Sequence, residues 1–171
     1  MDRFADVADQ YDPDAVEDRV FDYWEETDAY ETAKRNRRED PDAEPFFFVD
    51  GPPYTSGAAH MGTTWNKTLK DAYIRYLRMS GYDVTDRPGY DMHGLPIETK
   101  VEERLGFANK KDIEEFGIEA FIEECTSFAD EQLEGLQEDF ISFGVWMDWE
   151  NPYRTVTPEY MEAAWWGFAR A

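Results

Sequence analysis

Apolar and polar residues change their period near residue 60, and this change predicts an α/β order. Residues 46–49 (Phe-Phe-Phe-Val) form a short apolar run, typical of a strand buried on both faces of a parallel sheet. Residues 61–79 have a helical period, and we expect their helix to pack inward through Trp65, Leu69, Ala72, Tyr73, Tyr76 and Leu77. Gly81 suits the C-cap of this helix, and residues 82–87 are predicted to form a second strand.

The residues before the first strand are predicted to be a helical extension. Asp12 and Pro13 are residues that open helices, and we expect this helix to run to Thr32. A charged linker is predicted over residues 34–44. Residues 1–45 are therefore assigned to an extension and linker, and residues 46–171 to an α/β domain.

The second half of the chain is predicted to be mostly helical, at residues 95–105, 112–116, 118–143 and 158–171. The long third helix carries an apolar stripe made of Ile118, Phe121, Ile122, Cys125, Phe128, Ala129, Leu133, Leu136 and Phe140. Cys125 is the single cysteine, so we expect it to pack in the core and exclude a disulfide framework. The aromatic segment at residues 145–149 is also predicted to be core.

The loop between the first strand and the next helix has the composition of a phosphate site. It reads Asp-Gly-Pro-Pro-Tyr-Thr-Ser-Gly-Ala-Ala-His-Met-Gly-Thr over residues 50–63. It follows the carboxyl end of a strand and precedes a helix N-terminus, whose free N–H groups and positive dipole end favour an anion. Pro52 and Pro53 stiffen the loop, while Gly57 and Gly62 permit close approach of a ligand.

His60 is the candidate catalytic group of this loop. An imidazole at the helix start can donate a hydrogen bond to a phosphate oxygen whose charge grows in a transition state. The alternative is that His60 only caps the helix and that the glycines are ordinary turn residues. A P-loop is excluded, because Met61 and Asn66 occupy the two glycine positions that would precede Lys67.

A second block, residues 87–98, reads Arg-Pro-Gly-Tyr-Asp-Met-His-Gly-Leu-Pro-Ile-Glu. Its Pro-Gly turn follows the second strand, so Asp91 is expected at the carboxyl edge of the sheet, in one cleft with His60. Asp91 alternatively forms an Asx turn. His93 is assigned equally to bracing the loop or to contacting a substrate.

Together, the two blocks resemble the signature regions of class I aminoacyl-tRNA synthetases of the branched-chain subgroup, and the second block is similar to that of the isoleucyl branch. Three positions differ from the family pattern: Thr63 replaces a histidine, Tyr90 a tryptophan and Met92 a cysteine. The resemblance implies the first half of a Rossmann-like nucleotide-binding domain. It also implies an amino-terminal fragment truncated before the editing insertion and inactive by itself.

The resemblance further implies activation of L-isoleucine with ATP and Mg²⁺ and transfer to tRNA(Ile). By its motifs, the catalytic residues are His60 and Thr63, ATP is bound by Gly57, His60, Gly62 and Thr63, and the amino acid is bound by Gly51, Pro52 and Asp91. No metal ligands are identified. A valyl or leucyl ligase and a non-catalytic nucleotide- or RNA-binding remnant are the alternatives.

Charge and the amino terminus bear on the setting. The 171 residues include 39 acidic and 17 basic residues and have a net charge of −22, the wrong sign for a tRNA partner at ordinary salt. At about 1 M salt the Debye length is about 3 Å, which removes most of this penalty. We therefore expect a halophilic cytoplasm; the aromatic content of 16% argues against acidic disorder. Residues 1–9 lack the hydrophobic stretch of a signal or anchor, which predicts a cytoplasmic location without membrane contact.

Overall fold

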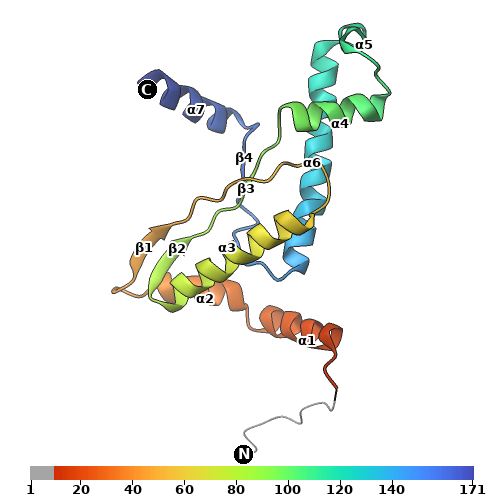
Figure 1. Ribbon diagram of the computed structural model, residues 1–171. Helices are drawn as coiled ribbons and strands as arrows, with labels where there is room; N and C mark the ends of the chain where they lie inside the picture. Colours follow the sequence, from red (N-terminus) through yellow and green to blue (C-terminus); the bar gives the residue numbers. More distant parts are fainter. Residues whose placement is uncertain (1–9) are drawn as a thin grey trace, which may run out of the picture.

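The computed structural model describes residues 10–171, so the prediction for residues 1–9 lies outside the described part. The order of elements there is α1 (Pro13–Glu26), α2 (Ala29–Arg38), β1 (Glu44–Phe47), α3 (Met61–Met79), β2 (Tyr82–Thr85), β3 (Gly89–Tyr90), α4 (Leu95–Leu105), α5 (Lys110–Phe116), α6 (Ile118–Ser142), β4 (Tyr153–Arg154) and α7 (Pro158–Arg170) (Figure 1). The predicted α/β order is confirmed. Within residues 10–171, no helix combines the length and the apolar character needed to cross a membrane.

The strands form two parallel pairs, β1 with β2 and β3 with β4. Helix α3 connects β1 to β2 and packs against this pair. The prediction that the first strand is buried on both faces is wrong. The strand occupies Glu44–Phe47, and Phe47 and Val49 are 70% and 69% exposed. The reason is that β1, within the described residues, pairs with β2 alone and reaches the core only through Phe46 and the following Phe48.

The amino-terminal extension is two helices and not one, which corrects the predicted helix to Thr32 and the predicted linker from residue 34. The break lies at Asp28, whose φ of 47° is left-handed, a conformation that aspartate tolerates better than most residues. This turn lets helix α2 pack against β2 and α3. Tyr30 Oη donates to Asp86 Oδ2 at 3.0 Å, and Arg37 Nε donates to the Arg78 carbonyl at 2.7 Å.

Helices α4 and α6 enclose the larger apolar core, as their periodicity predicts. Its buried members are Tyr90, Met92, Ile97, Val101, Phe121, Ala129, Leu133, Leu136 and Phe140. The predicted stripe is too long at its start, since Ile118 and Ile122 are 63% and 57% exposed. Cys125 packs at the edge of this core, as predicted, and burial raises the pKa of its thiol to about 11.

Helix α3 buries Leu77, as predicted, but the rest of its packing face differs from the prediction. Trp65, Leu69, Tyr73 and Tyr76 are between 51% and 66% exposed, and Ala72 is also exposed. The buried residues of the helix are Lys67, Asp71, Ile74, Leu77 and Arg78. Ile74 and Leu77 join Val84, Val145 and Met147 in a second core, so the prediction that residues 145–149 are core holds for Val145 and Met147. The charged side chains turn inward because buried ionic partners meet them there.

Candidate functional site

The two motif blocks are joined through their backbones. Asp91 N donates to the Pro53 carbonyl at 2.8 Å, and Thr55 N donates to the Asp91 carbonyl at 3.0 Å. These bonds form a parallel bridge between Tyr54 and Asp91. The loop after β1 and the segment after β2 therefore run side by side, as expected for the carboxyl ends of neighbouring parallel strands.

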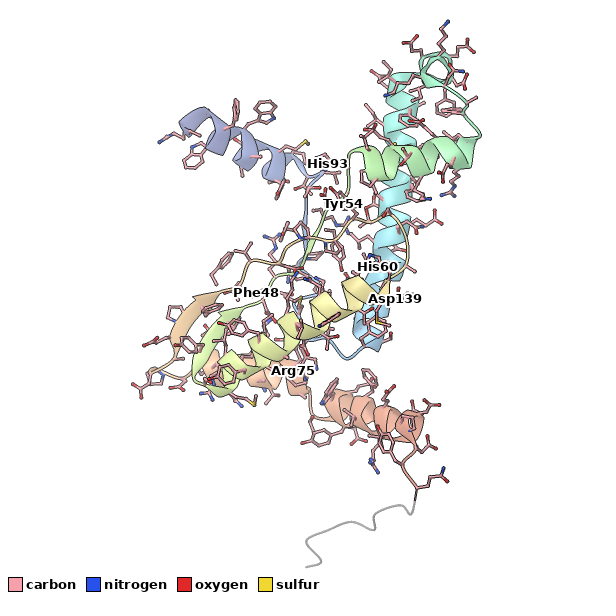
Figure 2. All side chains as sticks on the ribbon, in the orientation of Figure 1. Phe48, Tyr54, His60, Arg75, His93 and Asp139 are labelled. Atoms are coloured by element: carbon pink, nitrogen blue, oxygen red, sulfur yellow. The ribbon has the colours of Figure 1, made fainter. Side chains whose placement is uncertain are left out.

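His60 is the N-cap of α3, and its cap geometry assigns the ring tautomer. Nδ1 accepts from Gly62 N at 3.1 Å and from Thr63 N at 3.3 Å. An accepting Nδ1 carries no proton, so the proton of the neutral ring lies on Nε2. The imidazole is exposed at the start of the helix (Figure 2). His60 is thus a capping histidine that keeps one N–H free for a ligand.

Gly62 makes room for this cap. A Cβ at this position would lie 3.1 Å from Cε1 and 3.2 Å from Nδ1 of His60, a tight approach that would push the ring aside. The preceding loop is tied to α6, since Ala59 N donates to Asp139 Oδ2 at 2.8 Å. Together these contacts hold the helix N-terminus and its N–H groups in place.

A cavity of about 390 Å³ lies beside the loop. It is lined by Pro52, Pro53, Tyr54, Ser56, Gly57, Ala58, His60, Thr63 and Leu136. Of the predicted site residues, Pro52, Gly57, His60 and Thr63 meet there, whereas Gly51, Gly62 and Asp91 do not line it. The cavity that His60 lines does not include Asp91, since the loop continues from the Tyr54–Asp91 bridge to its bond with α6.

Asp91 is held by the buried hydroxyl of Thr155, the residue directly after β4. Thr155 Oγ1 donates to Asp91 Oδ1 at 3.3 Å and accepts from Met92 N at 3.0 Å. His93 Nδ1 lies 2.8 Å from the same hydroxyl and 3.5 Å from Asp91 Oδ1. The hydroxyl has one proton, so when it donates to Asp91 the His93 tautomer with its proton on Nδ1 is the one that donates to the hydroxyl. Asp91 keeps part of its carboxylate exposed, and His93 braces the loop in this arrangement.

Asp50, the first residue of the loop, has a carboxylate that bonds to both α3 and β3. It is fully buried, and Oδ2 accepts from Lys67 Nζ and, at 3.0 Å, from Gly89 N. Oδ1 accepts from Lys70 Nζ at 2.7 Å. The Asp50 carbonyl accepts from the hydroxyl of Tyr153.

Lys67 lies in apolar surroundings, and so its charge requires the ionic partner Asp50. Its ammonium lies 3.9 Å from Met147 Sδ and 5.0 Å from the centroid of the Phe140 ring. Desolvation lowers the pKa of Lys67, and the charge of Asp50 opposes this effect. Burial, with a further contribution from Asp50, raises the pKa of Tyr153 to about 12, so the phenol stays a donor.

Sequence reasoning missed Asp50, Lys67, Lys70 and Thr155 as parts of this site. For the two lysines a signal was present: residues 67, 70, 71, 74 and 78 lie three or four positions apart and so share a helix face. For Thr155 no local signal exists, since its neighbours come from distant segments. Among residues 10–171, no group of three or more His, Cys, Asp or Glu side chains is placed to hold a metal ion.

Comparison with known proteins agrees with the arrangement of the two blocks. The family model described as tRNA synthetases class I (I, L, M and V) matches residues 19–171. The chain therefore belongs to the class I tRNA synthetases. A solved structure, the AgnB2 LeuRS of Agrobacterium radiobacter K84 in a ternary complex with tRNA and LeuAMS, superposes with a TM-score of 0.65 over 94% of this chain and 18% of its own. At 22% identity, this likeness shows the fold.

Similar curated proteins are named isoleucine–tRNA ligase. The one from Natronomonas pharaonis is 80% identical over 171 residues, and the one from Haloarcula marismortui is 77% identical over the same length. Both come from halophilic archaea. The one from Archaeoglobus fulgidus is 52% identical over 162 residues, 95% of this chain and 15% of that protein. The chain covers 16% of the length of each of the first two relatives.

Proposed function

We propose that this chain is the amino-terminal part of an isoleucine–tRNA ligase, with L-isoleucine, ATP and tRNA(Ile) as its substrates. The observation that carries the proposal is the identity of 80% along the whole chain to a protein of that name. The paired motif blocks support it, since they place a helix N-terminus and a carboxylate on neighbouring segments. We assign residues 1–45 to the extension, residues 46–171 to the first half of the catalytic domain, and the enzyme to the cytoplasm, where tRNA is charged.

The proposed reaction has two steps. The isoleucine carboxylate attacks the α-phosphorus of ATP and pyrophosphate leaves; a ribose hydroxyl of the tRNA 3′ end then takes the aminoacyl group and AMP leaves. Chemistry of this kind depends on alignment and on stabilising charge, with no covalent enzyme group required. Mg²⁺ bound to ATP would neutralise phosphate charge.

We assign the phosphates to the start of α3. His60 has a free Nε2–H, and Thr63 adds a hydroxyl in the same cavity. The N–H groups of Gly62 and Thr63 are already bonded to His60 Nδ1, so the helix itself contributes the positive end of its dipole. Gly57, in the same cavity, leaves the backbone open to the nucleotide, because no atom lies within 4 Å of where its Cβ would be. We assign Gly62 to the adenosine end of the nucleotide.

We assign the amino acid to Asp91 of the second block and to the first residues of the loop. Asp91, partly exposed and oriented by Thr155, would pair with the α-ammonium group. Gly51 and Pro52 would lie along the isoleucine side chain. Since Asp91 is paired with Tyr54 and the loop runs on from there to His60, the reacting groups of the two substrates would meet beside this loop.

The test is amino-acid-dependent exchange between ATP and pyrophosphate, measured on the full-length enzyme in high KCl with isoleucine, valine and leucine in turn. We expect the largest kcat/KM with isoleucine. A larger value with valine or leucine would assign the protein to another branch, and no exchange with any of them would favour a non-catalytic remnant. We expect negligible exchange from residues 1–171 alone, which lack the remaining substrate contacts.

The role of His60 is tested by two substitutions with different effects on the cap. His60→Ala removes both the cap and the Nε2–H, whereas asparagine in His60→Asn is a good N-cap without a donor of the same reach. We expect both variants to lower kcat for exchange by about 100-fold to 1,000-fold, the range for one lost donor to a developing charge. Full activity in His60→Asn, with loss in His60→Ala, would limit His60 to capping.

A further inference from the structure

Asp50 contacts every element that carries the proposed site, which gives it a role distinct from that of the residues facing the substrates. Its side chain is 0% exposed and touches no cavity that a substrate enters. We propose that Asp50 is a positioning residue, which sets the His60 block and the Asp91 block in register through its pairs with Lys67 and Lys70 and its bond to Gly89. The inference rests on the proposed function and deepens it.

The first connection runs to the helix that begins with His60. Lys67 and Lys70, one turn apart on α3, both donate to the Asp50 carboxylate, and Lys70 Nζ also donates to the Gly51 carbonyl at 3.1 Å. Lys67 lies two helical turns from His60. Because a helix is stiff over this length, anchoring Lys67 fixes both the direction and the axial position of its N-terminus.

The second connection runs to the segment that carries Asp91. Gly89 N donates to Asp50 Oδ2 at 3.0 Å, two residues before Asp91. A side chain at position 89 would collide with the ring of Tyr153, whose hydroxyl donates to the Asp50 carbonyl. One residue thus joins the loop, α3, β3 and β4. No other carboxylate within residues 10–171 bonds to both α3 and the second motif block.

This arrangement predicts a particular kinetic signature. ATP is assigned to the first block alone, whereas isoleucine is assigned to Asp91 of the second block and to Gly51 and Pro52, which follow Asp50 directly. A change in register between His60 and Asp91 therefore leaves the ATP site intact and impairs the alignment of the two substrates more than the binding of isoleucine. In-line attack needs both blocks together, and a misplacement of about 1 Å can cost about 100-fold in rate. Loss of Asp50 should therefore lower kcat far more than it raises either KM.

The experiment uses the full-length enzyme with Asp50→Asn, and Asp71→Asn as the matched control. Asp71 is likewise a buried carboxylate, but it lies on α3. It accepts from Arg75 Nε at 2.8 Å and from Trp146 N at 2.8 Å, and it touches neither block. We expect Asp50→Asn to lower kcat for isoleucine-dependent exchange by about 100-fold per active site, with each KM within about threefold of wild type. Active sites are counted by a single turnover of adenylate formation. Asp71→Asn should keep kcat within about threefold, even where it lowers the melting temperature equally.

A partly exposed partner covers the case in which Asp50→Asn does not fold. The Lys70 side chain is 18% exposed, so Lys70→Met should fold, and we expect it to lower kcat by about tenfold with both KM values near wild type. The proposal is overturned if the foldable variants keep wild-type kcat, if KM rises while kcat stays unchanged, or if Asp71→Asn loses as much kcat.

A second readout separates this proposal from the proposed function. Hydrogen exchange followed by mass spectrometry reports on the amides of Thr55 and Asp91, which join the two blocks. In Asp50→Asn these amides should exchange at least about tenfold faster, while those at the centre of α6 stay unchanged. Unchanged protection at Thr55 and Asp91 would refute the positioning role whatever the activity. Failure of the wild-type enzyme to use isoleucine would refute only the function.

Discussion

The two cores of this protein are built in different ways. The core between α4 and α6 consists of apolar side chains and the phenol of Tyr90, and the helical period of its residues is visible in the sequence. The core beneath α3 combines apolar residues with buried ions: Asp50, Lys67, Arg78 and Asp86 are each at most 5% exposed. Apolar periodicity predicted the packing face in the first core and the wrong face in the second. It is therefore a reliable guide only where the buried positions are all apolar.

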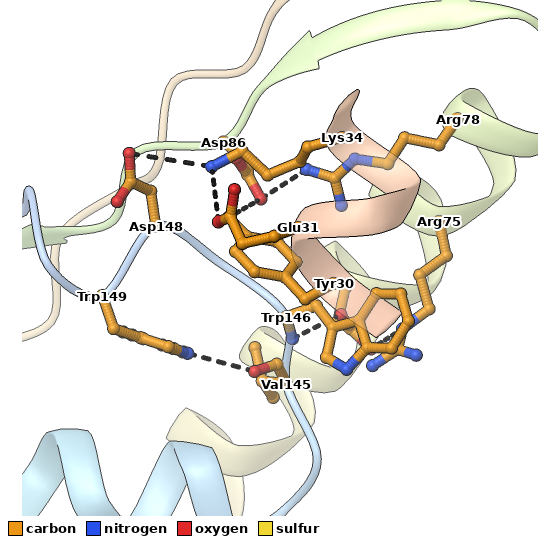
Figure 3. A network of polar contacts seen from close by, with 11 residues as sticks. Tyr30, Glu31, Lys34, Arg75, Arg78, Asp86, Val145, Trp146, Asp148 and Trp149 are labelled. Carbon is orange, nitrogen blue, oxygen red and sulfur yellow. Dashed lines mark hydrogen bonds and ion pairs between the residues drawn. The ribbon is translucent and has the colours of Figure 1, made fainter. Parts of the chain in front are cut away.

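The ionic part of the second core is continuous with the contact to the extension. Arg78 Nη2 donates to Asp86 Oδ2 at 2.5 Å, and Tyr30 of α2 donates to the same carboxylate (Figure 3). Burial, followed by the charge of Asp86, raises the pKa of Tyr30, so this phenol remains protonated. Arg75 lies 4.0 Å from the centroid of the Trp146 ring, beside the aromatic contact of Trp146 with Trp24.

The largest expected effect comes from breaking one buried pair of the second core. Arg78→Met leaves Asp86 as a buried carboxylate held only by Tyr30, and we expect the free energy of unfolding to fall by about 3–5 kcal/mol. The measurement is urea unfolding in high KCl. Since the pair is 5% and 1% exposed, added salt should change this loss little.

The matched control removes both charges. In Arg78→Met/Asp86→Leu no buried charge is left alone, so we expect most of the loss to be recovered. A double variant no more stable than the single one would contradict this account. It would show that the pair itself, with its hydrogen bonds, stabilises the region.

A smaller effect distinguishes the two faces of α3. Leu69 and Leu77 both belong to the predicted inward face, but Leu69 is 60% exposed and Leu77 is 6% exposed. We expect Leu69→Ala to change the unfolding free energy of this chain by less than about 0.5 kcal/mol and Leu77→Ala to lower it by about 2–5 kcal/mol. Thermal and urea unfolding of both variants measure the difference. Equal losses of unfolding free energy in the two variants would show that Leu69 is buried, as the apolar pattern predicted.

The sequence predicted part of the candidate site. The composition of the loop and its position after a strand predicted one ligand site that includes Pro52, Gly57, His60 and Thr63. These four residues line one cavity. The pairing of the loop with Asp91 was also expected and is present in the backbone. The position of Asp91 outside this cavity could not be predicted, because the path of the loop involves a bond to Asp139, 80 residues away.

The sequence by itself determined the α/β order, the extent of α3 and the apolar core of α6, because backbone periodicity and local capping are properties of neighbouring residues. The tertiary structure alone decided which face of α3 is buried, where the extension turns back, and how the two motif blocks are joined. These features depend on Asp50, Asp86 and Thr155 meeting partners from distant segments. A buried charge is stable only beside such partners, and their proximity is set by the fold.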